Sequence, residues 1–182
     1  MRTLALLTAA LALAALAACS DETKPRADGS TGADIATLFP ASNAISGWTA
    51  DAGGVKVYKT DAAAMGAVDG DADPFMKLKF TQFARLIYTN ASVTADVRVW
   101  QMPDAATCAT LFTSLASDSL YKPFTWEDTS VGEGGKIASA SGKYWVYAHK
   151  GAYEFEAKVQ AADEAAKTAS LGFVNYIAGK IQ

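Results

Sequence analysis

The sequence predicts an α+β domain built on a single twisted antiparallel sheet of about six strands, with two to three helices packed on it. Apolar and polar residues alternate over several stretches, as they do in strands that bury one face. Two-residue turn signals separate neighbouring stretches, which favours antiparallel hairpins. Elsewhere the apolar residues recur at every third or fourth position, which is typical of helices that pack on a sheet.

Six stretches carry the strand pattern. They are residues 55–59, 83–89, 92–102, 136–140, 143–149 and 152–161. Tight turns are expected at Asn90-Ala91, Ser141-Gly142 and Lys150-Gly151. The elements therefore follow the order β-α-β-β-α and then β-β-β-α, and no sequence repeat links the two halves.

The helical stretches have recognisable starts. Residues 35–40 predict a short helical turn that ends at Pro40. Each later helix begins after an aspartate that can accept hydrogen bonds from the first turn; these N-caps are Asp61, Asp104 and Asp163. The helix over 105–116 has one apolar stripe, formed by Cys108, Leu111, Phe112 and Leu115.

Two strands show which side chains share a face. Along 92–102, one face has Val93, Ala95, Val97 and Val99, and the other has Thr94, Asp96, Arg98 and Trp100. Along 152–161, one face has Tyr153, Phe155, Ala157 and Val159, and the other has Glu154, Glu156 and Lys158. This alternation is typical of antiparallel strands that are buried on one side.

The first nineteen residues predict export. Arg2 precedes an apolar run from Leu4 to Ala18, which has the composition of a secretory signal peptide. Leu16-Ala17-Ala18-Cys19 resembles the lipobox of bacterial lipoproteins. The resemblance implies that Cys19 receives a diacylglyceryl thioether, becomes the N-terminus after cleavage, and is acylated on its amine by a fatty acid such as palmitate. The alternative is a signal peptide without lipidation, in which the cysteine occurs by chance.

The chain is expected to have three parts: a lipoprotein signal peptide over 1–18, a flexible tether over 19–34, and a single α+β domain over 35–182. The tether combines both signs of charge with Pro and Gly and has little to bury. Within the lipoprotein resemblance, Ser20 implies sorting to the periplasmic face of the outer membrane in a diderm host, whereas an aspartate there would imply retention; Asp21 lies one residue later.

Composition limits the partners. The chain has 16 Lys and Arg against 19 Asp and Glu, without a block of either sign, which argues against nucleic acid as a partner. The expected partners are the membrane, through the lipid, and an envelope protein. If Cys19 is lipidated, Cys108 has no cysteine left to pair with, and we expect it to be buried and inert. One histidine excludes a multi-histidine metal site within the chain, and no cofactor motif is present.

Residues 38–116 are similar to a family of uncharacterised exported bacterial proteins, a domain of unknown function. The segments that carry the resemblance are Leu38-Phe39-Pro40, Gly47-Trp48, Tyr58, Val68-Asp69-Gly70-x-Ala72-Asp73-Pro74-Phe75, Val97-x-Val99-Trp100-x-Met102 and Asp104-Ala-Ala-x-x-x-x-Leu-Phe. Members of the family have Ile and Glu where this chain has Val68 and Asp73, and a Gly in the later helix that this chain lacks. The family carries no established activity, so the resemblance implies none.

Two groups of residues are candidate sites. Asp69, Asp71 and Asp73 have the spacing that begins a calcium loop, but Pro74 follows where an EF-hand needs Gly. They predict either a cation site of another kind or a solvated turn. Trp100 and Trp145 are candidate ligand-binding residues, because they lie off the main apolar faces and either line a groove or pack under a helix.

Two further features have structural interpretations. His149 is expected in an exposed hairpin turn, where it lacks the nucleophile and orienting acid that catalysis needs. Gly132-Glu133-Gly134-Gly135 lacks the Lys and the Ser or Thr that end a phosphate-binding loop and is interpreted as a flexible connection.

These observations favour a lipid-anchored envelope protein that acts as a non-catalytic binding or accessory module, without a cofactor. Two alternatives stay open. One is an envelope hydrolase that uses scattered acids such as Asp69, Asp71 and Glu127. The other is a structural subunit of an envelope complex.

Overall fold

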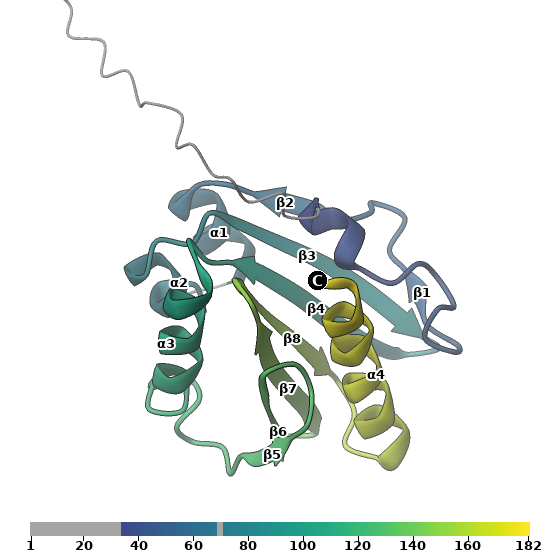
Figure 1. Ribbon diagram of the computed structural model, residues 1–182. Coiled ribbons are helices and arrows are strands. Elements are labelled where there is room, and N and C mark those ends of the chain that lie inside the picture. The colour runs from purple at the N-terminus through teal and green to yellow at the C-terminus, as the bar shows by residue number, and fades with distance from the viewer. Residues whose placement is uncertain (1–33, 69–70) are drawn as a thin grey trace, which may run out of the picture. The chain divides into compact units, whose positions relative to one another are not determined.

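A computed structural model describes residues 34–68 and 71–182. The predicted signal peptide, Cys19, the tether up to residue 33, and Asp69 and Gly70 lie outside the described residues. In the described part, one antiparallel sheet has the strand order β1-β3-β4-β8-β7-β6-β5, and β2 also pairs with β3 (Figure 1). The fold is therefore α+β with a single antiparallel sheet, as the hairpin pattern predicts.

The strands and helices have the following bounds. The strands are β1 (Thr49–Ala50), β2 (Lys56–Tyr58), β3 (Gln82–Asn90), β4 (Val93–Gln101), β5 (Glu127–Thr129), β6 (Gly134–Ala140), β7 (Lys143–Lys150) and β8 (Tyr153–Val159). The helices are the 3₁₀ helix η1 (Ile35–Leu38), α1 (Asp61–Val68), α2 (Asp73–Lys77), α3 (Ala105–Leu115) and α4 (Glu164–Lys180).

In residues 34–68 and 71–182 the sheet has eight strands, so the prediction of about six is wrong. The two strands that the sequence does not indicate are β1 and β5, which have two and three residues. A period of two cannot be recognised over so few residues, and these strands exist because the longer β3 and β6 offer them an edge. The described residues also include four α-helices rather than two or three. The extra one is α2, where Pro74 occupies an early position at which its missing N–H is not needed.

The hairpin turns and helix caps agree with the sequence in part. Ser141-Gly142 is the turn between β6 and β7, as predicted. The other two turns lie one residue later than predicted, because Asn90 pairs with Val93 and Lys150 pairs with Tyr153. The helix caps fall at Asp104, which accepts from the Thr107 N–H at 2.7 Å, and Asp163, which accepts from the Ala166 N–H at 2.8 Å.

Asp61 is not an N-cap. It is the first residue of α1, and the Thr60 hydroxyl accepts from the Ala63 N–H at 3.4 Å instead. Both Thr and Asp are good caps, and the adjacent threonine takes this position because the helix starts one residue earlier than the sequence indicates.

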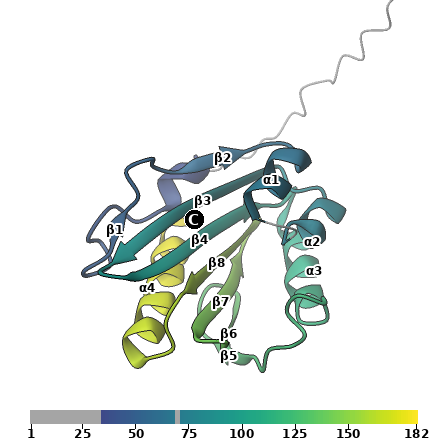
Figure 2. The same ribbon diagram turned by 180° about the vertical axis from the view of Figure 1, so that it is seen from behind.

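Each face of the sheet is covered by different helices. α4 packs on one face, where its Phe173, Val174 and Ile177 join a core with alternate residues of β3, β4, β7 and β8. α1, α2 and α3 pack on the other face, where Phe83, Trp100, Trp145 and Tyr147 belong to a second core. Strands β7 and β8 therefore run between α3 and α4, as both views show (Figures 1 and 2). Because β8 is central and covered on both sides, all seven of its residues are buried.

Candidate functional site: a charged cluster on the α3 side of the sheet

The register of two central strands brings charged side chains together in a buried layer. Arg98 of β4 lies directly opposite Glu156 of β8, and Asp96 lies opposite Lys158. These residues alternate with Val97 and Ala157, which face α4, so the charges point to the α3 side. Directly opposite side chains of opposite charge stabilise a strand pair.

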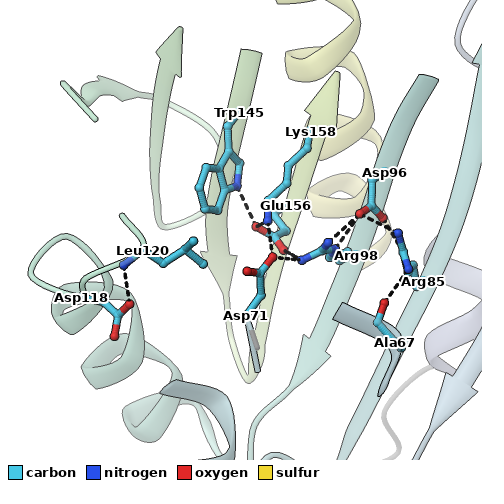
Figure 3. A network of polar contacts seen from close by, with 10 residues as sticks. All are labelled: Ala67, Asp71, Arg85, Asp96, Arg98, Asp118, Leu120, Trp145, Glu156 and Lys158. Carbon is cyan, nitrogen blue, oxygen red and sulfur yellow. Dashed lines mark hydrogen bonds and ion pairs between the residues drawn. The ribbon is translucent and has the colours of Figure 1, made fainter. Parts of the chain in front are cut away.

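Arg98 is at the centre of this layer (Figure 3). Its Nη2 and Nε atoms donate to Asp96 Oδ2 at 2.7 and 2.9 Å. Its Nη1 atom donates to Asp71 Oδ2 at 2.8 Å and to Glu156 Oε1 at 3.2 Å. The planar fork of donors lets one guanidinium hold three carboxylates at once.

Arg85 connects the same layer to a helix. Its Nε and Nη2 atoms donate to Asp96 Oδ1 and Oδ2 at 2.8 and 3.0 Å. Its Nη1 atom donates to the carbonyl oxygen of Ala67 near the end of α1. A cation at this end also complements the helix dipole, so Arg85 fixes the C-terminal end of α1 on the sheet.

Asp71 comes from the connection between α1 and α2 and is the outermost carboxylate. Its Oδ2 atom accepts from Arg98 and also from Lys158 Nζ, at 2.9 Å. Its side chain is 21% exposed, against 7% for Arg98 and 8% for Lys158. Burial opposes ionisation, but the attraction of Lys158 and the hydrogen bonds from Arg98 and Lys158 outweigh it and lower the pKa of Asp71.

Trp145 joins the layer through both its ring and its N–H group. Its Nε1 atom donates to Glu156 Oε2 at 2.7 Å, and Lys158 Nζ lies 4.0 Å from the centre of its ring. Lys158 Nζ is also 3.8 Å from Glu156 Oε2. We call Asp71, Arg85, Asp96, Arg98, Glu156 and Lys158 the charged cluster; its three cations match its three carboxylates.

A surface pocket of about 420 Å³ lies beside the outer carboxylate of the cluster. Its lining residues are Asp71, Asp73, Pro74, Lys77, Asp118, Ser119 and Leu120. The Asp118 carboxylate accepts from the Leu120 N–H at 3.0 Å, which shapes the loop on one side of the pocket (Figure 3).

Glu154 is next to the cluster but takes no part in it. It lies opposite Trp100 of β4 and His149 of β7, and it is fully buried. Over residues 34–68 and 71–182, neither of its carboxyl oxygens has a hydrogen-bond partner, and the same is true of Trp100 Nε1 and the Tyr147 hydroxyl. Burial, and then the nearby Glu156, raise the pKa of Glu154 well above its ordinary value.

The predicted cation ligands do not form a complete set in the described part of the chain. Asp69 lies outside it, Asp71 binds Arg98 and Lys158, and Asp73 is exposed at the start of α2. No group of three potential ligands is present among the described residues. A cation site that includes Asp69 stays a prediction.

Trp100 and Trp145 both lie inside the layer between the sheet and its covering segments. Trp100 is fully buried between Phe75 of α2 and Phe83 of β3, with ring centres 4.1 and 3.9 Å away. Trp145 is 2% exposed, and the ring of Tyr121 packs on it with the two ring centres 4.5 Å apart. Of the two sequence interpretations, the structure favours packing beneath other elements over lining an open groove.

His149 and Cys108 are both buried. The expectation of an exposed turn histidine is wrong, because the β7–β8 turn begins two residues after His149, which lies within β7. Its ring packs on Phe112 at 4.6 Å, and burial lowers its pKa although Glu133 raises it. Cys108 is buried, as predicted, and forms no disulfide among the described residues; burial raises the pKa of its thiol. A buried thiol of this kind is a poor nucleophile.

The glycine-rich segment is closely packed, so its interpretation as a flexible connection is wrong. A Cβ atom on Gly132 would lie 2.3 Å from the His149 carbonyl oxygen, and one on Gly135 would lie 2.4 Å from Thr129 Oγ1. Gly132 also has a φ of +64°, which favours glycine. Gly132 lets the β5–β6 connection approach β7, and Gly135 lets β6 approach Thr129 of β5, without a side chain between them.

Two acids of the hydrolase alternative, Asp71 and Glu127, lie on different faces of the sheet, and the third, Asp69, lies outside the described residues. Glu127 of β5 is directly opposite Ile137, which faces α4. Asp71 binds residues on the α3 side. The sheet therefore separates these two carboxylates.

Sequence reasoning missed the charged cluster as a unit, although it placed Asp96, Arg98, Glu156 and Lys158 on the correct faces. The available signal was that each strand has an acid two residues before a base, Asp96 before Arg98 and Glu156 before Lys158, so that antiparallel pairing sets each acid opposite a base. That signal becomes specific only when the two strands are known to be adjacent.

Comparisons with known proteins place the chain in no family. No family model matches it. No curated protein matches it significantly. Part of the structure is similar to the crystal structure of the extracellular domain of PknH from Mycobacterium tuberculosis, with a TM-score of 0.47 and 12% sequence identity over 79% of this chain and 94% of that chain. Among the helices of the described residues, none has the length and apolar composition to span a membrane. The resemblance of residues 38–116 to an exported family stays a prediction.

Proposed function

We propose that the protein is an exported lipoprotein, held in the cell envelope by lipid on Cys19, and that its folded domain is a non-catalytic binding or accessory module. The observation that carries the proposal is Leu16-Ala17-Ala18-Cys19 at the end of the apolar run Leu4–Ala18. Two or three acyl chains hold a protein stably on a membrane, whereas one chain does so marginally. In a diderm host, Ser20 favours the periplasmic face of the outer membrane.

The chemistry of the charged cluster supports binding or scaffolding over hydrolysis. Its carboxylates are bound by Arg85, Arg98 and Lys158. The lowered pKa values of Asp71 and Asp96 make both groups weak bases and leave them without a proton to donate near neutral pH. The hydrolase alternative has less support, because the sheet separates Asp71 from Glu127.

Metabolic labelling with an alkyne palmitate tests the anchor. We expect wild-type protein to be labelled and to resist extraction by salt, because acyl burial rather than charge holds it. Cys19→Ser should lose the label and remain unprocessed. Cys108→Ser is the matched control, because it removes the other cysteine of the chain and should keep the label. Equal labelling of wild type and Cys19→Ser would contradict the proposal.

A photo-crosslinking experiment tests the accessory role. A crosslinking amino acid replaces either Lys77 of α2 or Lys180 of α4, which are both exposed and belong to helices on opposite faces of the sheet. An accessory module should give a specific adduct with an envelope protein at one position and not at the other. Adducts at neither position would contradict a protein partner, and turnover in a hydrolase panel that disappears in Asp71→Asn would overturn the non-catalytic role.

A further inference from the structure

The buried carboxyl group of Glu154 is the least explained polar group of the sheet. It is fully buried on the α3 side, between Trp100 and His149 on the neighbouring strands. Within the part of the chain that the structure describes, both of its oxygens lack a hydrogen-bond partner. A buried polar group without a partner is costly, and such groups are rare outside sites with a function.

The charges around Glu154 are already balanced without it. Arg85, Arg98 and Lys158 are bound by the carboxylates of the charged cluster. An ionised Glu154 would be an additional buried carboxylate two residues from Glu156 on the same strand face. A buried charge without a counter-ion is far more costly than a neutral group, so Glu154 carries a proton in this arrangement.

Arg98 is a cation on the strand next to Glu154. It lies directly opposite Glu156, which makes Glu154 its diagonal neighbour across the β4–β8 pair. Its Nη1 atom is shared between Asp71 and Glu156, at 2.8 and 3.2 Å. Asp71 is the most exposed carboxylate bound to Arg98, so it loses the least when water replaces one of its two cations.

We propose that Glu154 is a proton-binding site, and that loss of its proton draws Arg98 away from Asp71. With the proton bound, Arg98 and Lys158 both hold Asp71 and so fix the residues before α2 on the sheet. Without the proton, Arg98 turns to the Glu154 carboxylate and Asp71 keeps Lys158 alone. The domain then has two arrangements of one ion network, and the external proton concentration sets their ratio.

Other titratable or charged groups face this region from every element packed on it. They are Arg85 of β3, Asp96 and Arg98 of β4, Asp128 of β5, Lys136 of β6, Tyr147 and His149 of β7, Glu156 and Lys158 of β8, Cys108 of α3, Tyr121 of the loop after α3, Glu133 of the loop before β6, and Asp71 before α2. Burial raises the pKa of the Tyr147, Tyr121 and Cys108 groups and lowers that of His149, so these four stay neutral near pH 7. Glu154 differs from these four groups because its raised pKa follows from a buried carboxyl group without a hydrogen-bond partner among the described residues.

The coupling is reciprocal and can be measured from both ends. In the full chain with ¹³C-labelled Glu side chains, NMR should show one carboxyl group, absent from Glu154→Gln, that titrates well above the ordinary range of glutamate. Asp71→Asn removes the carboxylate that competes for the Arg98 Nη1 group, so the Glu154 carboxyl group should lose its proton at a lower pH. Asp73→Asn is the matched control, because Asp73 is exposed and outside the cluster, and it should leave the titration unchanged.

Hydrogen exchange measures the consequence for Asp71. After correction for intrinsic rates, the protection of residues 71–77 should fall by about tenfold or more as Glu154 loses its proton, which is the effect of one lost charge-assisted hydrogen bond. Glu154→Gln should keep the protection constant over the same range. A Glu154 carboxyl that titrates in the ordinary range, or a fall in protection that persists in Glu154→Gln, would overturn the inference. It does not depend on the lipid anchor and can fail while the anchor is confirmed.

Discussion

Replacing Glu154 by Met is expected to stabilise the protein, although most substitutions of fully buried residues destabilise it. The structure gives the reason: Glu154 is fully buried, and among the described residues nothing donates to or accepts from its carboxyl oxygens. A buried polar group that is left unsatisfied costs about 1–3 kcal/mol, and an unbranched apolar side chain of similar length removes that cost. The free energy of unfolding should therefore rise by about 1–3 kcal/mol, which corresponds to about 2–4 °C in Tm per kcal/mol.

The gain should depend on pH in a definite direction. The pKa of Glu154 is raised in the folded protein, so between its ordinary value and its folded value the folded state holds a proton that the unfolded state has lost. Wild-type stability therefore falls as pH rises through this window, by up to about 1.4 kcal/mol per pH unit, and levels off above the folded pKa. The advantage of Glu154→Met should grow over the same window and be smallest in acid.

Urea unfolding at several pH values measures both effects, with the m value checked for constancy. Glu154→Gln is the control, because it keeps an unsatisfied polar group but cannot ionise; it should lose the pH dependence without the full gain in stability. A Glu154→Met protein that is less stable than wild type at every pH would refute the reasoning, because it would show that the carboxyl group is satisfied in the folded protein.

Three further predictions follow from single contacts. Arg98→Met should destabilise the protein by about 3–5 kcal/mol in urea unfolding, because it leaves buried carboxylates without their cation; a cost below about 1 kcal/mol would contradict the central position of Arg98. Gly135→Ala should lower the free energy of unfolding by about 1–3 kcal/mol through its contact with Thr129 Oγ1, and adding Thr129→Ala should recover part of this loss. Gly66→Ala is the control: its methyl group meets open space within α1, so it should raise the free energy of unfolding by about 0.5–1 kcal/mol. Cys108 should react with a maleimide only after unfolding; rapid labelling of the native protein would contradict its burial.

The sequence predicts the strands and helices of this fold better than it predicts which of their faces are buried by other elements. Alternation along 152–161 assigns Phe155 and Ala157 to one face and Glu154 and Glu156 to the other, as the structure shows. The same pattern suggests that the charged face is in solvent, and that inference fails. Burial of β8 on both faces depends on β4, β7 and α3, which come from distant parts of the chain.

His149 illustrates a second limit. A shift of one residue in the β7–β8 turn moves it from a predicted exposed turn into a buried strand position. In this position, the His149 carbonyl oxygen occupies the space that a side chain on residue 132 would need, so only glycine fits there. Composition alone makes such a segment look flexible, whereas the partner strand makes it closely packed.

The charged cluster could not be inferred from either strand alone, because its charges balance only when Asp71, from outside the sheet, is included. Glu156 can neutralise only one of its two neighbouring cations, Arg98 and Lys158. Asp96 is shared between Arg98 and Arg85, so one positive charge is left over. Asp71 supplies the remaining negative charge from a connection between helices, so the sheet is balanced only when that connection is docked. An ion network of this kind contributes less to net stability than to the choice of one arrangement over another, because desolvation offsets much of the attraction. Glu154 lies beside the network without belonging to it, so a change in its charge can shift the balance between the arrangement in which Arg98 holds Asp71 and the one in which it does not.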